Sequence, residues 1–156
     1  MRIRPATASD IAAIAEVGAK TWPLTYAFAG TDYIAHGLAT WWSPHAIARS
    51  LTTTDVLVAE TEPSTVIGTG NIDLRGETAI IWKLYVLPPA QGTGAGHALI
   101  TALTDRAPGR TVQLEYTDGN HRAARFYAAH GFTELRREPS GTPGWPDTVW
   151  LTKEQP

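Results

Sequence analysis

Cysteine is absent from the sequence, and this absence excludes disulfides, thiolate metal sites and a cysteine nucleophile. No stretch reaches the roughly 18 apolar residues that a membrane span requires. The N-terminal segment also lacks the apolar core of a secretory signal peptide. Neither charge sign dominates, since 13 Lys and Arg residues face 15 Asp and Glu residues for a net charge of −2. The sequence therefore predicts a cytoplasmic protein that binds neither nucleic acid nor a membrane.

Metal-binding patterns are missing from the sequence as well. The HExxH motif of zinc-dependent hydrolases does not occur, and the histidines show no metal-ligand spacing. The five histidines are His36, His45, His97, His121 and His130. We therefore expect no metal in this protein.

The composition is that of one folded domain. The chain has 156 residues, of which 43% are hydrophobic and 18% are charged. Such a chain is long enough to bury a core without disulfides or metals, and neither a linker nor an internal repeat divides it. The sequence predicts a single domain over residues 1–156.

Strand-like and helical patterns alternate along the chain in the order β-α-α-β-β-β-α-β-α-β-β. This order predicts an α+β fold with one mixed, mostly antiparallel sheet of six to seven strands flanked by helices. Turns at Glu62-Pro63-Ser64 and Gly76-Glu77 would join three of the strands into a meander. The strands are expected at 2–6, 55–62, 65–75, 78–87, 111–117, 133–139 and 148–154.

The first helices are less clearly marked than the strands. Apolar residues at helical spacing over 11–22 predict one helix, which Pro23 is expected to end or kink. Ser43-Pro44 has the pattern of a helix cap followed by a first-turn proline, and opens a short helix through Leu51. The aromatic segment 24–42 between them is ambiguous and is expected to be partly helical.

Three glycines, Gly92, Gly94 and Gly96, precede an apolar helix in the segment QGTGAGHALITAL (91–103). Glycine in a helix costs roughly 1 kcal/mol relative to alanine, so their presence suggests a ligand that approaches the backbone closely. Free N–H groups at a helix start favour a phosphate. A Walker loop is excluded because His97-Ala98 stands where Lys-Ser or Lys-Thr is needed. The G-x-G-x-G spacing also differs from a dinucleotide fingerprint, and a glycine-rich turn without a ligand stays open on the loop alone.

Two longer segments carry a family resemblance. LYVLPPAQGTGAGHALI (84–100) resembles the acyl-CoA-binding motif of the GCN5-related N-acetyltransferases (GNAT). LEYTDGNHRAARFYAAHGF (114–132) is similar to the second motif of the same family. The two motifs follow one another in the family's order, and the resemblance covers nearly the whole chain, although residues 20–50 match only loosely. It implies the GNAT fold and an acyl-CoA-dependent N-acyltransferase.

The resemblance also implies how acetyl-CoA is bound. The cosubstrate would lie between strands 78–87 and 111–117, which splay apart in this family. Its pyrophosphate would sit on the N–H groups from Gly92 to His97, and its pantetheine arm would follow the backbone of the first strand. The residues expected to bind acetyl-CoA are Leu84, Tyr85, Val86, Gln91, Gly92, Thr93, Gly94, Ala95, Gly96, His97, Asn120 and Tyr127.

The second motif resembles the family members that acetylate the N-terminal alanine of a ribosomal protein. In those enzymes a glutamate acts as base, an asparagine five residues later binds the cosubstrate, and a tyrosine seven residues further acts as acid. Glu115, Asn120 and Tyr127 have these separations. The resemblance therefore implies direct acetyl transfer to an amine, with Glu115 as base, Tyr127 as acid and a backbone N–H near Val86 as oxyanion donor. A thiol and a phenol have pKa values of roughly 8.5 and 10, close enough for proton transfer.

Structural roles stay open for each of these residues. Tyr127 could be a core aromatic residue, Asn120 a helix cap and Glu115 a solvated surface glutamate. Many family members carry a carboxylate on the central strand where this chain has Ile80, which leaves Glu115 or a water chain as the base. Lys83 on the same strand either reaches solvent with its charged end at an edge of the sheet or lines the cleft, and the first, structural role is the one expected.

Arg122 lies early in the helix that follows the second motif. It is expected on a solvated helix face, and contact with the ribose phosphate of the cosubstrate stays open as the alternative.

In this family the first helices and the loop between the last two strands build the acceptor pocket. Trp22, Tyr26, Tyr33 and Trp145 are the substrate-binding residues expected there. An aromatic, weakly charged wall favours an amino acid, an amino sugar, an antibiotic or an apolar amine over a polyamine. The alternative that these tryptophans make core or dimer contacts stays open, and the dimers of many relatives make a homodimer a further expectation.

The expected function is acetyl transfer from acetyl-CoA to a primary amine of a small molecule. Two alternatives share every motif described above. One is acetylation of a protein N-terminus or lysine, and the other is a non-catalytic acyl-CoA-binding module.

Overall fold

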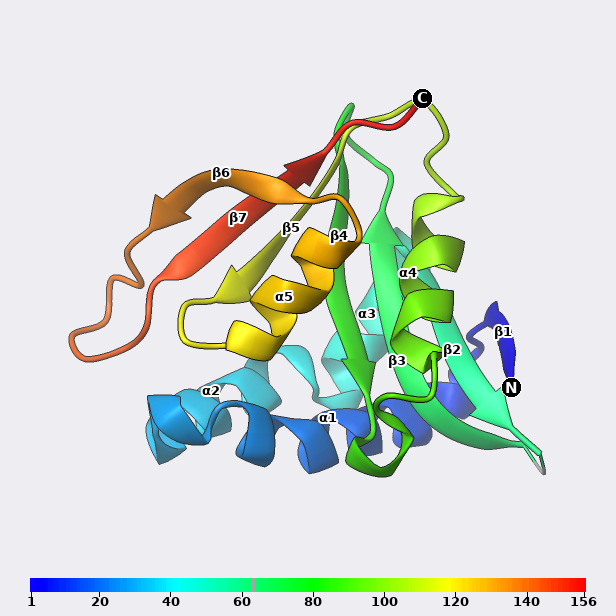
Figure 1. The fold of residues 1–156 in the computed structure, drawn as a ribbon. Helices are drawn as coiled ribbons and strands as arrows, with labels where there is room; N and C mark the ends of the chain where they lie inside the picture. Colours follow the sequence, from blue (N-terminus) through cyan, green and yellow to red (C-terminus); the bar gives the residue numbers. More distant parts are fainter. Residues whose placement is uncertain (63) are drawn as a thin grey trace.

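The computed structural model describes residues 1–62 and 64–156 and contains one seven-stranded sheet with helices on both faces (Figure 1). Its strands are β1 (Arg2–Pro5), β2 (Asp55–Thr61), β3 (Thr65–Asp73), β4 (Ala79–Val86), β5 (Val112–Thr117), β6 (Thr133–Glu138) and β7 (Thr148–Lys153). Only β4 and β5 are parallel to each other, and the other neighbouring strands are antiparallel. The predicted α+β class and mixed sheet are confirmed. The predicted turn at 62–64 includes Pro63, which lies outside the described residues.

Five α-helices accompany the sheet in the described residues. They are α1 (Ile11–Thr25), α2 (Thr31–Trp41), α3 (Pro44–Thr53), α4 (Ala95–Thr104) and α5 (His121–Ala129). The α3 start follows the sequence prediction, because the Ser43 side chain accepts a hydrogen bond from the Ala46 N–H. The ambiguous segment 24–42 folds largely as α2, so three helices precede β2 where two were predicted.

Pro23 does not end α1, as the sequence suggested it could. The helix continues to Thr25, and the Tyr26 N–H donates to the Trp22 carbonyl at 2.9 Å beyond the proline. Proline removes only its own N–H from the helix ladder. The tertiary contacts of the last turn therefore hold the helix together at that point.

The strand order is β1-β2-β3-β4-β5-β7-β6. β4 and β5 are paired only from Ala79 to Ile81 on β4 and from Val112 to Leu114 on β5. Beyond these residues the two strands diverge in the middle of the sheet (Figure 1). The predicted splay between these strands is therefore present.

β4 also contains a bulge at the point where it leaves β5. Against β3, Lys83 is opposite Asn71 and Ile81 is opposite Ile72, so Trp82 is an extra residue. A bulge shifts the alternation of side chains along the strand. Residues after Trp82 therefore face the opposite side from the one that their number alone would give.

Two hydrophobic clusters fill the spaces on the two faces of the sheet. One contains Ile81, Leu99 and Leu103, with Leu84 packed against it, and lies between the sheet and helices α4 and α5. The other contains residues of α1 and α3, with Tyr85 packed against it. The neighbouring β4 residues Leu84 and Tyr85 thus pack on opposite faces of the sheet, at the level where β4 and β5 diverge.

None of the helices in residues 1–62 and 64–156 combines the length and the apolar character that crossing a membrane would take.

Candidate active site

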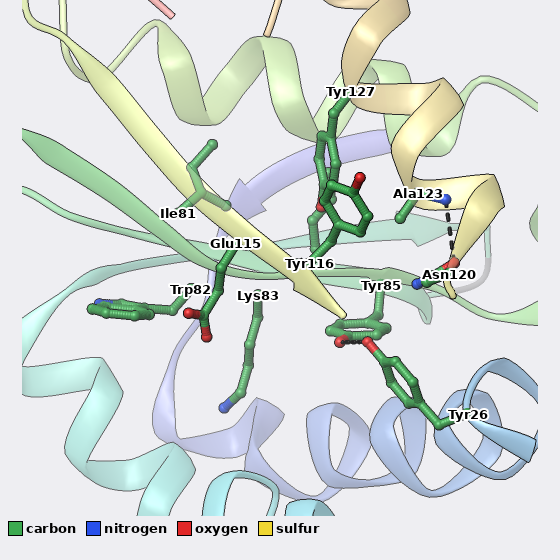
Figure 2. Close-up of a pocket in the computed structure, with 11 residues that line it drawn as sticks. Tyr26, Ile81, Trp82, Lys83, Tyr85, Glu115, Tyr116, Asn120, Ala123 and Tyr127 are labelled. Atoms are coloured by element: carbon green, nitrogen blue, oxygen red, sulfur yellow. Dashed lines mark hydrogen bonds between the residues drawn. The ribbon is translucent and has the colours of Figure 1, made fainter. Parts of the chain in front are cut away.

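Two cavities that share lining residues occupy the space between β4, β5 and α5. The smaller one, called the chamber below, has a volume of about 50 Å³ and is shown in Figure 2. The larger one, called the groove, has a volume of about 360 Å³ and extends to the glycine loop. Both are lined by Leu84, Tyr85, Asn120, Ala123 and Tyr127. A ligand in the groove would therefore reach the chamber past these residues.

The glycine loop forms one end of the groove. Gly92 and Gly94 have φ angles of 81° and 93°, a region that favours glycine, and no atom lies within 4 Å of a Cβ built on either. Their backbone is therefore bare on the groove side, directly before α4 begins. The combination of open backbone and helix N-terminus fits an anionic group such as a pyrophosphate.

The third glycine, Gly96, is needed for helix packing and not for an open backbone. A Cβ on Gly96 would lie 3.2 Å from the Phe126 ring, so this glycine lets α5 pack closely against α4. Thr93 and Ala95 do not line the groove, since the Thr93 hydroxyl donates to the Ala90 carbonyl and Ala95 is buried in the core. Any contact of these two residues with a ligand would come from their backbone.

Gln91 and Arg122 join the loop to α5 across the groove. Gln91 Nε2 donates to the Val86 carbonyl at 3.0 Å, and the Arg122 guanidinium donates to Gln91 Oε1. Arg122 is exposed, as expected of a solvated helix face, and it also lines the groove, where it brings a positive charge beside the glycine loop.

His97 also lines the groove, and its ring is held by a second histidine. His97 Nδ1 is 2.9 Å from His130 Nε2, while His130 Nδ1 is 2.8 Å from the Phe126 carbonyl. Because a carbonyl only accepts, His130 Nδ1 carries the proton of that bond, and His130 Nε2 and His97 Nδ1 share the other one. The remaining His97 nitrogen is left for the groove.

Tyr127 projects from α5 into the splay (Figure 2) and is only 8% exposed. Burial raises the pKa of its hydroxyl, and the nearby Tyr26 adds to the rise. The phenol is therefore a weaker acid than the sequence comparison assumed, and it stays protonated across the physiological pH range. Within the described part of the chain its hydroxyl makes no hydrogen bond, so the proton is available to a ligand.

Glu115 is the first residue of β5 beyond its last pair with β4, and it lines the chamber. Although the residue is exposed overall, the protein around its carboxyl displaces water, and this desolvation raises the pKa of Glu115. The Glu138 carboxylate adds to the rise, and the Arg136 guanidinium opposes it. Figure 2 shows the Glu115 carboxyl pointing away from Tyr127, so the two residues lie on opposite sides of one opening.

Asn120 caps α5 and lines both cavities. Its side-chain oxygen accepts a hydrogen bond from the Ala123 N–H at 3.2 Å. Asn120 therefore is the helix cap that the sequence suggested. Its position in both linings also allows it to contact a ligand.

Lys83 was expected in a structural role, but the structure places it in the chamber. Its ammonium donates to the Trp41 carbonyl at 2.6 Å and lies 4.7 Å from the centre of the Trp42 ring. Burial lowers the pKa of Lys83 to about 8. The bulge at Trp82 explains this placement, because it turns Lys83 to the side of the sheet that Glu115 also faces (Figure 2).

Among the four expected substrate-binding residues, only Tyr26 lines the chamber, where its hydroxyl is 2.7 Å from the Tyr85 hydroxyl. Trp22 is 5% exposed and stacks on Tyr33, with 5.9 Å between the ring centres. Trp145 meets Tyr33 edge-on at 5.4 Å. These three aromatic residues therefore lie behind the chamber rather than on its surface.

Residues 1–62 and 64–156 contain no cluster of three or more histidine, aspartate or glutamate side chains placed to hold a metal ion.

Solved structures resemble this chain along nearly its full length. PaiA N-acetyltransferase from Thermoplasma acidophilum, in complex with coenzyme A, has a TM-score of 0.81 at 21% identity, over 98% of each chain. The ribosomal-protein-S18-alanine N-acetyltransferase from Escherichia coli has a TM-score of 0.78 at 18% identity, over 98% of this chain and 92% of that one. The yncA protein from Salmonella typhimurium, solved with its cofactor acetyl-CoA, has a TM-score of 0.69 at 26% identity, over 100% and 94%.

No curated protein matches the sequence of this chain. A family model described as "Acetyltransferase (GNAT) domain" matches residues 52–134, which run from the end of α3 into β6 and include the glycine loop and α5. This match spans more than half of the 156 residues. The chain therefore belongs to the GNAT family of acetyltransferases.

Proposed function

We propose that this protein transfers an acetyl group from acetyl-CoA to a primary amine of a small molecule, in one direct step within the chamber. The observation that carries the proposal is that groove and chamber share lining residues, among them Tyr127, while Glu115 lines the chamber alone. Relatives of the same fold that hold coenzyme A or acetyl-CoA support the choice of cosubstrate.

The groove provides two kinds of contact for acetyl-CoA. The bare amides of the glycine loop and the Arg122 guanidinium suit the pyrophosphate. Beyond Ile81 the edge of β4 that faces β5 has no strand beside it, so its N–H and C=O groups are available to the amides of the pantetheine arm. When bound, acetyl-CoA supplies the activated thioester.

Groups of the protein then act on the three atoms whose charge changes, which are the acceptor nitrogen, the carbonyl oxygen and the sulfur. The Glu115 carboxylate accepts a proton from the acceptor ammonium, and its raised pKa makes it a stronger base than an ordinary glutamate. A backbone N–H of the free β4 edge donates to the developing oxyanion. As the C–N bond forms and the C–S bond breaks, the Tyr127 hydroxyl donates its proton to the sulfur and takes up the second proton of the acceptor nitrogen, so that it ends the step protonated.

A small acceptor is favoured because the chamber is small. At about 50 Å³ it accommodates the reacting atoms, and Tyr26 and Tyr85 form a hydrogen-bonded wall on its α1 side. A protein N-terminus, as in the name of the Escherichia coli relative, is the competing acceptor.

The test is release of free thiol from acetyl-CoA at pH 8 with amino acids, simple amines, aminoglycosides and peptides as acceptors. We expect turnover with a small amine and a fall of at least tenfold in kcat for both Tyr127→Phe and Glu115→Gln. Glu16→Gln, an exposed substitution on α1, is the matched control and should keep full activity. Tight binding of acetyl-CoA without turnover of any acceptor would instead favour the binding-module alternative.

A further inference from the structure

The chamber contains a cation that no carboxylate neutralises. None of the ion pairs among residues 1–62 and 64–156 includes Lys83. Its ammonium has three protons, and the only hydrogen bond it makes in the described structure is to the Trp41 carbonyl. Burying a charge without an opposite charge is unfavourable, so this site is short of one anion.

The same chamber contains one anion, and it lies on the opposite strand. Glu115 and Lys83 are the only charged residues among those that line the chamber. They do not form an ion pair, although both point to the same side of the sheet (Figure 2). Arg136 and Glu138, which lie near Glu115, are already paired with each other at 2.8 Å. The chamber thus presents two separate, opposite charges across the splay.

The surface next to these charges is apolar and firmly held. Trp82 is 43% exposed, and its ring is fixed by an Nε1 hydrogen bond to Asp73 at 3.2 Å and by an edge-on contact with Trp150 at 6.0 Å. An acceptor that fills this space therefore has an ammonium, an anionic group and an apolar substituent.

We infer that the acceptor is a free amino acid with an apolar side chain, an inference that rests on the function proposed above. Its carboxylate would pair with the Lys83 ammonium while Glu115 takes the proton from its amine. Its side chain would lie against Trp82. A polyamine would bring a second cation toward Lys83 and be repelled, and a peptide N-terminus has no carboxylate next to its amine. Lys83 is then a specificity-determining residue of this enzyme.

The test compares amino acids with the amines that they become on losing the carboxylate. The pairs are leucine with 3-methylbutylamine, phenylalanine with phenethylamine, and methionine with 3-(methylthio)propylamine. The measured quantity is the ratio of kcat/KM between the two members of a pair, at pH 7.5. We expect a ratio of at least ten in favour of the amino acid, arising mainly from a lower KM.

Variants of Lys83 decide whether this residue causes the preference. Lys83→Met and Lys83→Gln should each lower the ratio at least tenfold, whereas Lys83→Arg should keep most of it. Lys20→Met, on the exposed side of α1, is the matched control and should leave the ratio unchanged. Calorimetric binding of acetyl-CoA verifies that each variant is folded.

The failures of this inference and of the proposed function are distinguishable. The inference would be overturned if the enzyme preferred amines, spermidine or a peptide over amino acids and if Lys83→Met left the kcat/KM ratio unchanged. The proposed transferase activity would still stand in that case. Binding of acetyl-CoA with no thiol release for any acceptor would overturn both.

Discussion

Ile81 and Leu114 are the last two residues that β4 and β5 hold side by side. The next residue on each strand, Trp82 and Glu115, already lines the chamber. The opening in the sheet therefore begins where the candidate base is, and the bulge in β4 lies at the same level. This geometry links the break in strand pairing directly to the chemistry and leads to the following predictions.

Glu115→Gln should lower kcat/KM by about 10²–10⁴-fold, the usual contribution of general base catalysis. The pKa of Glu115 is raised, so activity in the wild type should fall as the pH decreases through a value above that of an ordinary glutamate. A pH–rate profile from pH 4.5 to 9 measures this acidic limb. The limb should disappear in the variant, and its persistence there would assign it to another group.

Tyr127→Phe should lower kcat at least tenfold without weakening acetyl-CoA binding or the fold. The hydroxyl makes no hydrogen bond within the described residues, so its removal leaves no partner unsatisfied. Urea denaturation should give a free energy of unfolding within about 1 kcal/mol of the wild type. A large loss of stability would instead indicate the purely structural role that the sequence left open.

Lys83→Met should stabilise the protein at neutral pH. The pKa of Lys83 is about 8 in the folded protein against 10.5 in the unfolded chain, so the protonated form disfavours folding below pH 8. This penalty decreases as the pH rises from 8 to 10.5 and is absent above that range. The difference between the two pKa values corresponds to about 3 kcal/mol at pH 7. The lost hydrogen bond to Trp41 reduces the expected gain in the free energy of unfolding to roughly 2 kcal/mol. At pH 10.5 the gain should nearly vanish.

Urea denaturation of Lys83→Met at both pH values measures this difference, with Lys20→Met as the control. An equal gain at pH 7 and pH 10.5 would mean that packing, and not the buried charge, is responsible.

Gly18→Ala and Gly37→Ala should each destabilise the protein by about 1–3 kcal/mol or more, the usual cost of overpacking. A Cβ on Gly18 would collide with the Trp42 ring, and one on Gly37 with the Trp22 ring. Gly76→Ala is the matched control, because the nearest atom to its Cβ would be the Thr78 carbonyl oxygen at 3.6 Å. Thermal unfolding of the three variants should separate the first two from the third.

Much of the fold followed from the sequence because its signals are local. The apolar strand before the glycine loop, the loop itself and the capped helix at Asn120 each have a residue pattern that fixes their structure. Helix α2 had no such pattern. Its formation depends on close packing, since Gly37 touches the Trp22 ring of α1, a contact between residues far apart in the sequence.

The candidate site was predicted unevenly for a similar reason. Motif spacing brought Glu115, Asn120 and Tyr127 to the same opening, as expected. The sequence left two positions open for Lys83, because its direction depends on the bulge at Trp82, which no residue pattern predicts. The contact of Arg122 with Gln91 was not predicted, because it joins two elements that the sequence separates by about 30 residues.

The bulge at Trp82 changes which residues of β4 face the core. Before it, odd-numbered residues such as Ala79 and Ile81 face α4 and α5, and after it even-numbered residues such as Leu84 do. Deleting Trp82 would restore the regular alternation of the strand, and Lys83 and Leu84 would keep the sides that they now occupy. The extra residue thus adds one aromatic side chain to the acceptor side of β4 while the buried positions of the strand stay where they are.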